Sequence, residues 1–238
     1  MANSISCSII IPCYNEAKNL PILLKRCEEV YFLGQNLEIV IVDNGSTDNS
    51  SAVLDELGIR FSFITRVNVK INKGYGFGIL AGLEVAQGEI LGWTHADMQT
   101  DLGDALKGLD FFNGESNSEE LFVKGRRQGR PLTDVFFTMG MSIFETLLLR
   151  KFMWDINAQP TMFHRKFFLT WNMPPKDFSL DLYAYYMAKK SRLVVKRFPV
   201  VFAERAHGVS NWNVSFISKY RFIKRTLLYS FGLQKRMR

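Results

Sequence analysis

A carboxylate and an amide follow a short apolar run near the middle of the chain. Asp97 and Gln99 come directly after the strand-like residues 90–93. In an extended segment, side chains two residues apart point to the same side, so both groups face one direction. Their oxygen atoms are hard ligands that suit Mg²⁺ or Mn²⁺. An aspartate after a strand can also be only a turn former or a helix cap, so the pair alone leaves both interpretations open.

Two further strand ends carry candidate binding residues. Asp43 follows the near-continuous apolar run 37–42, which is typical of a strand buried on both faces of a parallel sheet. It could accept a hydrogen bond from a ligand, or it could only cap the helix expected at residues 49–57. Pro12, Tyr14 and Glu16 follow the apolar run 6–11. Tyr14 could stack on a base, and Glu16 could also be a first-turn acid favoured by the helix dipole.

The elements that must position these residues alternate along the first half of the chain. Apolar periodicity predicts strands at 6–11, 37–42, 61–65, 89–94 and near 120–124, with helices at 17–32, 49–57, 74–85 and near 102–112. This alternation predicts an open, mostly parallel α/β sheet with flanking helices. Ligands of such sheets bind beyond the carboxyl ends of the strands, where Pro12, Asp43 and Asp97 fall.

The second half is less regular, with helices predicted at 135–149 and 179–190, a loop and strand at 155–163 and a strand at 193–202. The 238 residues are 47% hydrophobic and 22% charged, which suits one large domain with a real core. No stretch of 18 residues lacks charge, so a membrane-spanning helix is not expected. The three cysteines lack the spacing of a metal site, and we expect them to be reduced, buried and cytosolic.

The net charge of +7 is concentrated in the last 25 residues. Residues 214–238 contain no acid and seven basic residues: Lys219, Arg221, Lys224, Arg225, Lys235, Arg236 and Arg238. If residues 214–231 are helical, five apolar side chains form one stripe: Phe216, Tyr220, Ile223, Leu227 and Phe231. This pattern is typical of an amphipathic helix on an anionic membrane surface. The alternative is an ordinary C-terminal helix packed on the domain. No nucleic-acid partner is expected, because no nucleic-acid-binding module is recognisable.

Several segments together resemble the inverting family 2 glycosyltransferases with the GT-A fold. Residues 9–16 resemble the opening strand and PxYNE loop of that family, 42–48 its VDDGSxD turn, and 72–74 its NxG helix entry. Residues 95–99 resemble the DADxQ metal motif, 124–127 the GSR motif, and 157–160 and 205–212 later motifs. The likeness covers residues 6–213 and is greatest to dolichyl-phosphate mannose synthase and bacterial polyprenyl-phosphate glycosyltransferases. It implies a GT-A (Rossmann-like) domain at 1–213, followed by a basic amphipathic membrane-associating segment at 214–238.

The resemblance also implies roles for individual residues. It assigns the donor nucleotide to Pro12, Tyr14, Glu16, Asp43, Gly74, Ala96 and Asp97, and Mg²⁺ or Mn²⁺ to Asp97 and Gln99. Phosphate groups are expected at Arg127, Arg205 and Ser210, since guanidinium forks match phosphate oxygens. The expected catalytic residues are Asp97, Arg127 and Asp181. The chain departs from the family pattern at three positions: His95 replaces the first Asp of the metal motif, Arg126 a Ser, and Asn211 a frequent Lys.

The predicted reaction is metal-dependent transfer of a sugar, with inversion, from a GDP- or UDP-sugar to a polyprenyl phosphate. We expect it at the cytoplasmic face of the membrane, on a cytoplasmic protein bound peripherally to the bilayer. A first alternative is a transferase that extends a glycan or lipid-linked sugar through a hydroxyl, which needs a base such as Asp181. A phosphate acceptor needs no strong base, because its second pKa is about 6. A second alternative is a non-catalytic nucleotide- or nucleic-acid-binding module.

Overall fold

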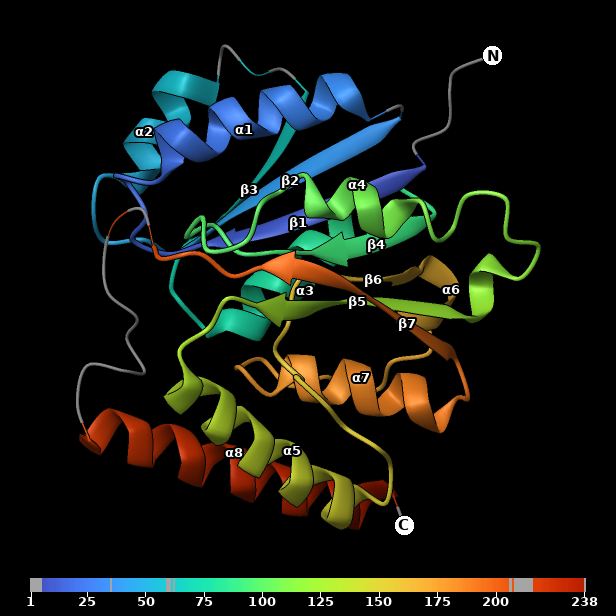
Figure 1. Ribbon diagram of the computed structural model, residues 1–238. Coiled ribbons are helices and arrows are strands. Elements are labelled where there is room, and N and C mark those ends of the chain that lie inside the picture. Colours follow the sequence, from blue (N-terminus) through green and yellow to red (C-terminus); the bar gives the residue numbers. More distant parts are fainter. Residues whose placement is uncertain are drawn as a thin grey trace.

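The computed structural model describes residues 6–34, 36–58, 61, 63–205, 207 and 216–237. Within them, seven strands form one sheet in the order β3-β2-β1-β4-β6-β5-β7 (Figure 1). The strands are β1 (Cys7–Cys13), β2 (Leu37–Asn44), β3 (Ile64–Val69), β4 (Ile90–Trp93), β5 (Leu121–Gln128), β6 (Thr161–His164) and β7 (Val194–Val201). Only β6 runs antiparallel to its neighbours in this part of the chain. The predicted, mostly parallel α/β sheet is thereby confirmed.

Helices cover both faces of the sheet (Figure 1). One face carries α1 (Leu20–Leu33), α2 (Ser50–Gly58) and α4 (Asp104–Leu109), and the other carries α3 (Tyr75–Val85) and α7 (Leu180–Lys190). Beyond α7 lie α5 (Leu132–Leu149) and α8 (Phe216–Met237), side by side. The short helices η1 (Ser118–Glu120) and α6 (Arg165–Phe168) adjoin the amino end of β5 and the carboxyl end of β6.

The central strands are buried on both faces, as their continuous apolar sequence predicts. Alternate residues of β1 enter different cores: Ile9 and Ile11 pack with α1, whereas Ile10 packs with α3 and α7. The parallel register places Pro12 beside Val42 and Cys13 beside Asp43, and it pairs Ile10 with Trp93 of β4. The carboxyl ends of β1, β2 and β4 therefore meet at one edge of the sheet, where the sequence predicts the site.

The predicted helices and strands are present, with some shifts in their bounds. The strand expected at residues 61–65 starts later, at Ile64, because Phe61 and Phe63 contact each other and Phe63 stacks on Tyr31 of α1, with ring centroids 4.3 Å apart. These aromatic residues anchor a turn instead of pairing with β2. The predicted helix 102–112 is shorter, Asp104–Leu109, and that at 135–149 begins earlier, at Leu132, directly after Pro131.

Helices α5 and α8 run in the same direction and are joined by polar contacts. Ser230 donates a hydrogen bond to Glu145, and the amide of Gln234 donates to the carbonyl of Leu148 at 2.8 Å. By length and composition, α5 is the one helix of the described residues that could cross a bilayer, a test that core helices of soluble proteins also pass. Helix α5 contains two charged residues in 18, so it passes this test although no stretch of 18 residues is free of charge, and the expectation that no helix spans the membrane stays a prediction. Only 17% of α5 is buried.

Candidate active site

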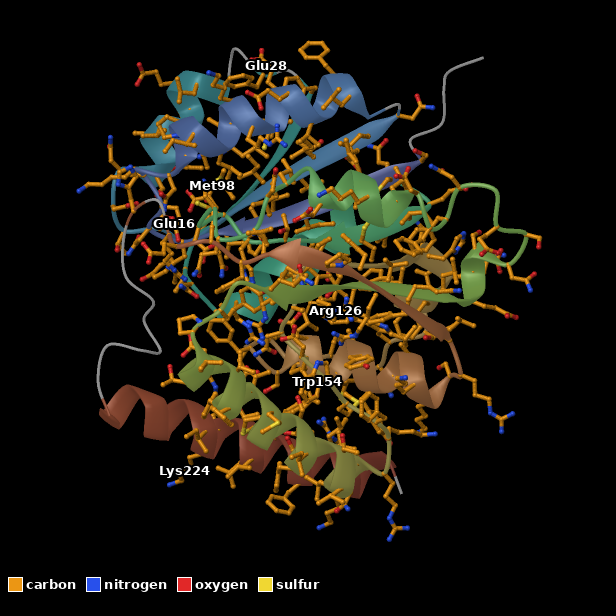
Figure 2. All side chains as sticks on the ribbon, viewed as in Figure 1. Glu16, Glu28, Met98, Arg126, Trp154 and Lys224 are labelled. Atoms are coloured by element: carbon orange, nitrogen blue, oxygen red, sulfur yellow. The ribbon has the colours of Figure 1, made fainter. Side chains whose placement is uncertain are left out.

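A cavity of about 480 Å³ opens at the carboxyl edge of the sheet. Ten of the residues predicted from the sequence line it: Pro12, Tyr14, Glu16, Gly74, Ala96, Asp97, Gln99, Arg127, Asp181 and Arg205. In Figure 2, Glu16 and Met98 lie at this end of the sheet. Asp43 is not among the lining residues, and Ser210 lies outside the described residues. Six separate segments of the chain thus converge on one cavity.

The Asp97–Gln99 turn forms one end of the cavity. Asp97 is buried, and its Oδ1 accepts a hydrogen bond from the backbone N–H of Gln99 at 3.1 Å. Met98 between them has a φ of 59°, in the left-handed region that a non-glycine residue rarely adopts. His95, which replaces the usual aspartate, also lines the cavity, and its ring stacks on Tyr75 with centroids 5.8 Å apart. The turn therefore presents one carboxylate and one amide to the cavity.

This set of donors fits a divalent cation that is shared with a ligand. Among the described residues, no group of three or more His, Cys, Asp or Glu side chains could hold a metal alone. Mg²⁺ is commonly bound by one or two carboxylates together with substrate phosphates and water. Asp97 and Gln99 supply the protein part of such a set, and the remaining ligands would have to come from a diphosphate and solvent.

Glu16 and Asn44 extend the cavity toward β1 and β2. Burial raises the pKa of Glu16, and a hydrogen bond from Asn19 opposes that shift. Asp43 accepts from the backbone N–H of Ser46 at 3.1 Å, so its carboxylate holds the turn after β2. The adjacent Asn44 lines the cavity in its place, and its Nδ2 donates to the carbonyl of Gly74 at 2.9 Å. Its Oδ1 is buried without a partner among the described residues, which leaves an acceptor for a ligand N–H.

Gly74 is fixed in this position by its backbone. Its φ is 111°, and a Cβ atom here would lie 2.4 Å from the carbonyl oxygen of Lys176. Since no side chain fits, the loop before α3 can approach both Asn44 and the segment before α7 closely. The glycine predicted from the NxG motif therefore shapes this wall through its lack of a side chain.

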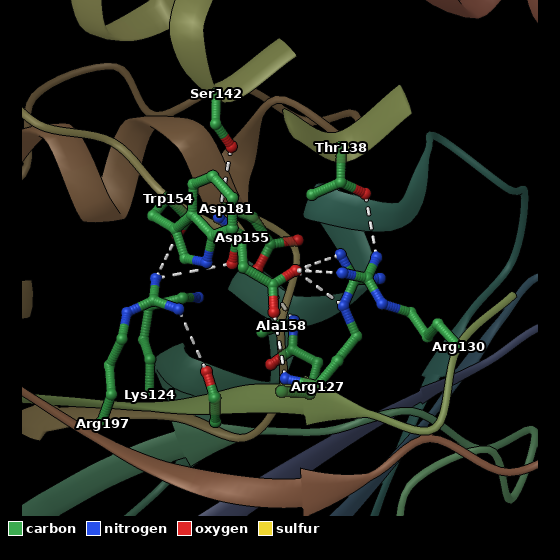
Figure 3. A network of polar contacts seen from close by, with 12 residues as sticks. Lys124, Arg127, Arg130, Thr138, Ser142, Trp154, Asp155, Ala158, Asp181 and Arg197 are labelled. Carbon is green, nitrogen blue, oxygen red and sulfur yellow. Dashed lines mark hydrogen bonds and ion pairs between the residues drawn. The ribbon is translucent and has the colours of Figure 1, made fainter. Parts of the chain in front are cut away.

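Two arginines form the opposite wall around a buried aspartate (Figure 3). Arg127 donates to Asp155 from its side-chain Nε at 2.8 Å and from its backbone N–H at 3.0 Å. Arg130 lies 3.6 Å from the same carboxylate and donates to Thr138 Oγ1 at 2.9 Å. Burial alone would raise the pKa of Asp155, but the nearby charges and hydrogen bonds outweigh it and hold that pKa below its ordinary value. Two guanidinium groups thus share the buried carboxylate of Asp155, and the carboxylate of Asp134 lies in the same part of the lining.

Asp181 lies on the first turn of α7, and two donors fix its orientation. Gln159 Nε2 donates to Asp181 Oδ1 at 2.8 Å, and the indole N–H of Trp93 donates to the same atom at 3.2 Å. Behind it, the fully buried Lys124 donates to Thr161 Oγ1 at 2.6 Å. Burial lowers the pKa of Lys124 to about 7, and the charge of Asp181 opposes this shift. A buried, oriented carboxylate is suited to accept a proton or a hydrogen bond from a ligand hydroxyl.

The sequence did not predict Arg130, Asn44 or Asp155 as part of the site. Asn44 lies within the motif at 42–48, beside the predicted Asp43, and Arg130 lies three residues after the predicted Arg127, so this closeness in sequence was the available signal. Asp155 carries no such signal, because it lies 28 residues after Arg127 in the sequence and contacts it only in the folded chain. Of the predicted site residues that the structure describes, Asp43 is the one that does not line the cavity.

Comparisons with known proteins agree with this geometry. The family model "Glycosyl transferase family 2" matches residues 8–174. Over 95 residues, 39% of the chain, the sequence is 41% identical to an undecaprenyl-phosphate 4-deoxy-4-formamido-L-arabinose transferase from Pseudomonas savastanoi pv. phaseolicola. An enzyme of the same name from Aeromonas hydrophila subsp. hydrophila is 36% identical over 97 residues, also 39% of the chain. The matched parts span 28% and 29% of the lengths of these relatives.

Solved structures share the fold at low sequence identity. One is a mannosyltransferase from Pyrobaculum calidifontis in complex with GDP-Man and Mn²⁺, with a TM-score of 0.71 and 18% identity over 99% of this chain and 65% of that one. Another is glucosyl-3-phosphoglycerate synthase from Mycobacterium tuberculosis in complex with Mn²⁺, UDP and glucosyl-3-phosphoglycerate. Its TM-score is 0.67 and its identity 15%, over 97% of this chain and 81% of that one. The described fold is thus that of GT-A glycosyltransferases.

Proposed function

The chain belongs to glycosyl transferase family 2, and from this premise we propose that it transfers a sugar from a nucleotide-sugar to a polyprenyl phosphate with inversion. The observation that carries the proposal is the division of the cavity. One end presents Asp97 and Gln99, and another part of the lining presents Arg127 and Arg130, whose guanidinium groups share the carboxylate of Asp155. A single cavity therefore offers one site for a metal-bound diphosphate and a second site for another phosphate.

The donor diphosphate is placed at the Asp97 end. There Asp97 and Gln99 would hold Mg²⁺ or Mn²⁺, which supplies charge neutralisation for the departing nucleoside diphosphate. The two solved neighbours described above contain Mn²⁺ with GDP-Man or UDP, which supports this placement. Tyr14 and Glu16 line the path toward β1, where the nucleoside would lie, and Asn44 offers an unpaired acceptor to its base.

The acceptor phosphate is placed against Arg127 and Arg130. Guanidinium groups bind phosphate oxygens in pairs, and Asp155 keeps both forks in position before the acceptor arrives. A phosphate oxygen then attacks the anomeric carbon from the side opposite the donor diphosphate. The new carbon–oxygen bond forms as the old one breaks, and the nucleoside diphosphate leaves with the bonding electrons. The names of the curated relatives, undecaprenyl-phosphate transferases, support this class of acceptor.

A second candidate function is supported by Asp181. Its burial and its two hydrogen bonds suit a base that takes a proton from a sugar hydroxyl. Such an enzyme would extend a glycan or a lipid-linked sugar. The phosphate acceptor is preferred because it makes use of the two arginines and needs no base.

The acceptor lipid places the enzyme at a membrane, and helices α5 and α8 provide the surface for it. Their large apolar side chains are more than half exposed at Leu132, Phe136, Ile143, Leu147, Leu228 and Phe231. Basic side chains lie nearby, including Lys224, which projects from α8 (Figure 2). We therefore infer a peripheral protein on the cytoplasmic face of an anionic membrane, with α5 and α8 against the lipid.

The test uses undecaprenyl phosphate, a panel of GDP- and UDP-sugars and Mn²⁺ or Mg²⁺, with the lipid-linked product followed by mass. We expect product from the wild type, and Asp181→Asn within about tenfold of it, about 1.4 kcal/mol. We expect Arg130→Lys, which keeps the charge but loses the fork, to lower turnover about a hundredfold, with Arg126→Gln as the exposed control. No lipid product with any donor, together with hydroxyl transfer that collapses in Asp181→Asn, would establish the second candidate.

A further inference from the structure

The guanidinium of Arg205 contacts both side chains that we assign to the metal, those of Asp97 and Gln99. Its Nη2 is 2.7 Å from Asp97 Oδ2, and its Nε donates to Gln99 Oε1 at 3.2 Å. The side chain of Asp97 is 8% exposed and that of Arg205 is 25% exposed, so the ion pair is partly shielded from water. A cation of this protein thus already neutralises the carboxylate and uses the amide oxygen that a metal would need.

The segment that carries Arg205 is tied to the same turn through its backbone. After β7, the backbone N–H of Phe202 donates to the carbonyl of Gln128 at 2.9 Å, and that of Ala203 donates to the carbonyl of Gln99 at 2.8 Å. These two hydrogen bonds therefore hold the backbone in place at the edge of the site, directly before Arg205. The guanidinium stands at the end of a long, partly exposed side chain, so it can leave Asp97 while the backbone stays anchored.

A metal ion and the Arg205 guanidinium compete for these oxygen atoms. Both are cations, and both need Asp97 and the Gln99 amide oxygen as partners. A metal that binds alone must break the ion pair and leave Arg205 in the cavity without its partner, beside Glu16. A bound diphosphate removes this penalty, because its oxygens offer the guanidinium a new partner of the same charge as Asp97.

We propose that Arg205 is a displaceable counterion that makes metal binding depend on the donor. This inference rests on the proposed donor site. Without a donor, Arg205 occupies Asp97 and Gln99 and keeps metal affinity low. When the nucleoside diphosphate binds, Arg205 moves from Asp97 to the phosphates, and the metal takes its place. Metal and nucleotide then bind with positive coupling, and each raises the affinity for the other by the same factor.

The experiment measures Mn²⁺ affinity directly, by electron paramagnetic resonance of free Mn²⁺, with and without UDP or GDP. It compares the full-length wild type, Arg205→Gln and the control Arg126→Gln, which removes a positive charge from an exposed residue outside the cavity lining. Without nucleotide, we expect Arg205→Gln to bind Mn²⁺ at least tenfold more tightly than the wild type and the control. Because the diphosphate also supplies metal ligands, we expect the nucleotide to tighten Mn²⁺ binding in both proteins, with a coupling factor at least tenfold larger in the wild type than in Arg205→Gln.

Equal Mn²⁺ affinity in wild type and Arg205→Gln without nucleotide would overturn the proposal, and so would an unchanged coupling factor. A lower melting temperature with unaltered metal affinity would show that the ion pair only stabilises the fold. Calorimetric titration with UDP and GDP separates this result from failure of the proposed function. A wild type that binds neither nucleotide contradicts the donor site itself, whereas a coupling factor that is the same in the wild type and in Arg205→Gln contradicts only the role of Arg205.

Discussion

At the scale of single residues, Asp97 carries the carboxylate charge of the candidate metal end. His95 stands where the family motif has another aspartate, so Asp97 alone must balance the metal on the protein side. We expect Asp97→Asn to lower metal-dependent turnover about a thousandfold, about 4 kcal/mol of barrier, because the leaving diphosphate loses its bridged cation. Initial rates against Mn²⁺ concentration measure this, with circular dichroism as the control for folding. Near-normal rates in the variant would refute the assignment.

Substitution of His95 tests the opposite change, in which a carboxylate is added near Asp97. We expect His95→Asp to raise Mn²⁺ affinity in the presence of nucleotide about tenfold, because a second carboxylate then faces the turn at Asp97. The variant loses the ring contact with Tyr75, which is worth about 1 kcal/mol in stability. Mn²⁺ titration and thermal unfolding measure the two effects separately. Unchanged affinity would mean that residue 95 does not face the bound metal.

Most of the site residues predicted from the sequence line the cavity, because strand ends and motif positions indicate which residues gather at the sheet edge. The different contacts of Asp43 and Asn44 could not be predicted. Both follow the same strand, and only the turn geometry decides that Asp43 binds the Ser46 N–H while Asn44 reaches the cavity. The Arg130–Asp155 ion pair could not be predicted either. Asp155 lies 25 residues after Arg130 in the sequence, and the pair depends on how α5 packs against the loop that contains Asp155.

At the scale of elements, α5 and α8 are joined through a buried carboxylate. Glu145 accepts a hydrogen bond from Ser230 through one oxygen, and its other oxygen has no partner among the described residues. Burial raises its pKa from 4.5 to about 7, and the Ser230 hydrogen bond opposes the shift. The folded state therefore holds this proton more tightly than the unfolded chain. The resulting stabilisation is complete below about pH 4.5 and is lost as the pH rises through about 7.

We expect Glu145→Gln to remove this pH dependence, because the amide keeps the shape of the side chain but cannot ionise. The variant should match the wild type below about pH 4.5 and exceed its free energy of unfolding above pH 7, by about 3 kcal/mol at pH 8. Urea unfolding across this pH range measures the difference. Glu56→Gln on the exposed side of α2 is the control. If both variants follow the wild-type curve, Glu145 is already charged in the folded protein.

At the scale of the whole molecule, the apolar surface differs from the one that the sequence predicts. The expected stripe on α8 is partly turned inward: Ile223 and Leu227 are half-buried, and Phe231 contacts Phe144 of α5. Most of the exposed apolar area in this region belongs to α5, at Leu132, Phe136, Ile143 and Leu147. Helical periodicity identifies an apolar stripe but cannot tell whether a neighbouring helix or a membrane covers it. Here two helices share one surface.

Because α5 and α8 form one apolar surface together, the test of membrane binding has to leave the contacts between them intact. Deletion of residues 214–238 would remove Leu233 from a buried apolar cluster and Ser230 from Glu145, so it would disturb the fold as well as the surface. Substitutions on the exposed side of α5 leave these contacts in place. Phe136 and Leu147 are 64% and 74% exposed, and Phe32 and Leu33 of α1, across the sheet, are 76% and 72% exposed and provide a matched control pair.

We expect the double variant Phe136→Ser/Leu147→Ser to bind anionic liposomes at least tenfold more weakly than the wild type, because two apolar side chains lose about 1–2 kcal/mol each of burial in lipid. Phe32→Ser/Leu33→Ser should bind like the wild type. Lys224→Gln/Lys235→Gln should weaken binding at low salt and have little effect at high salt, since screening removes the attraction of exposed charges. Co-sedimentation at both salt concentrations measures all three variants. Equal losses in the α1 and α5 variants would show that lipid contact is not specific to the α5–α8 surface.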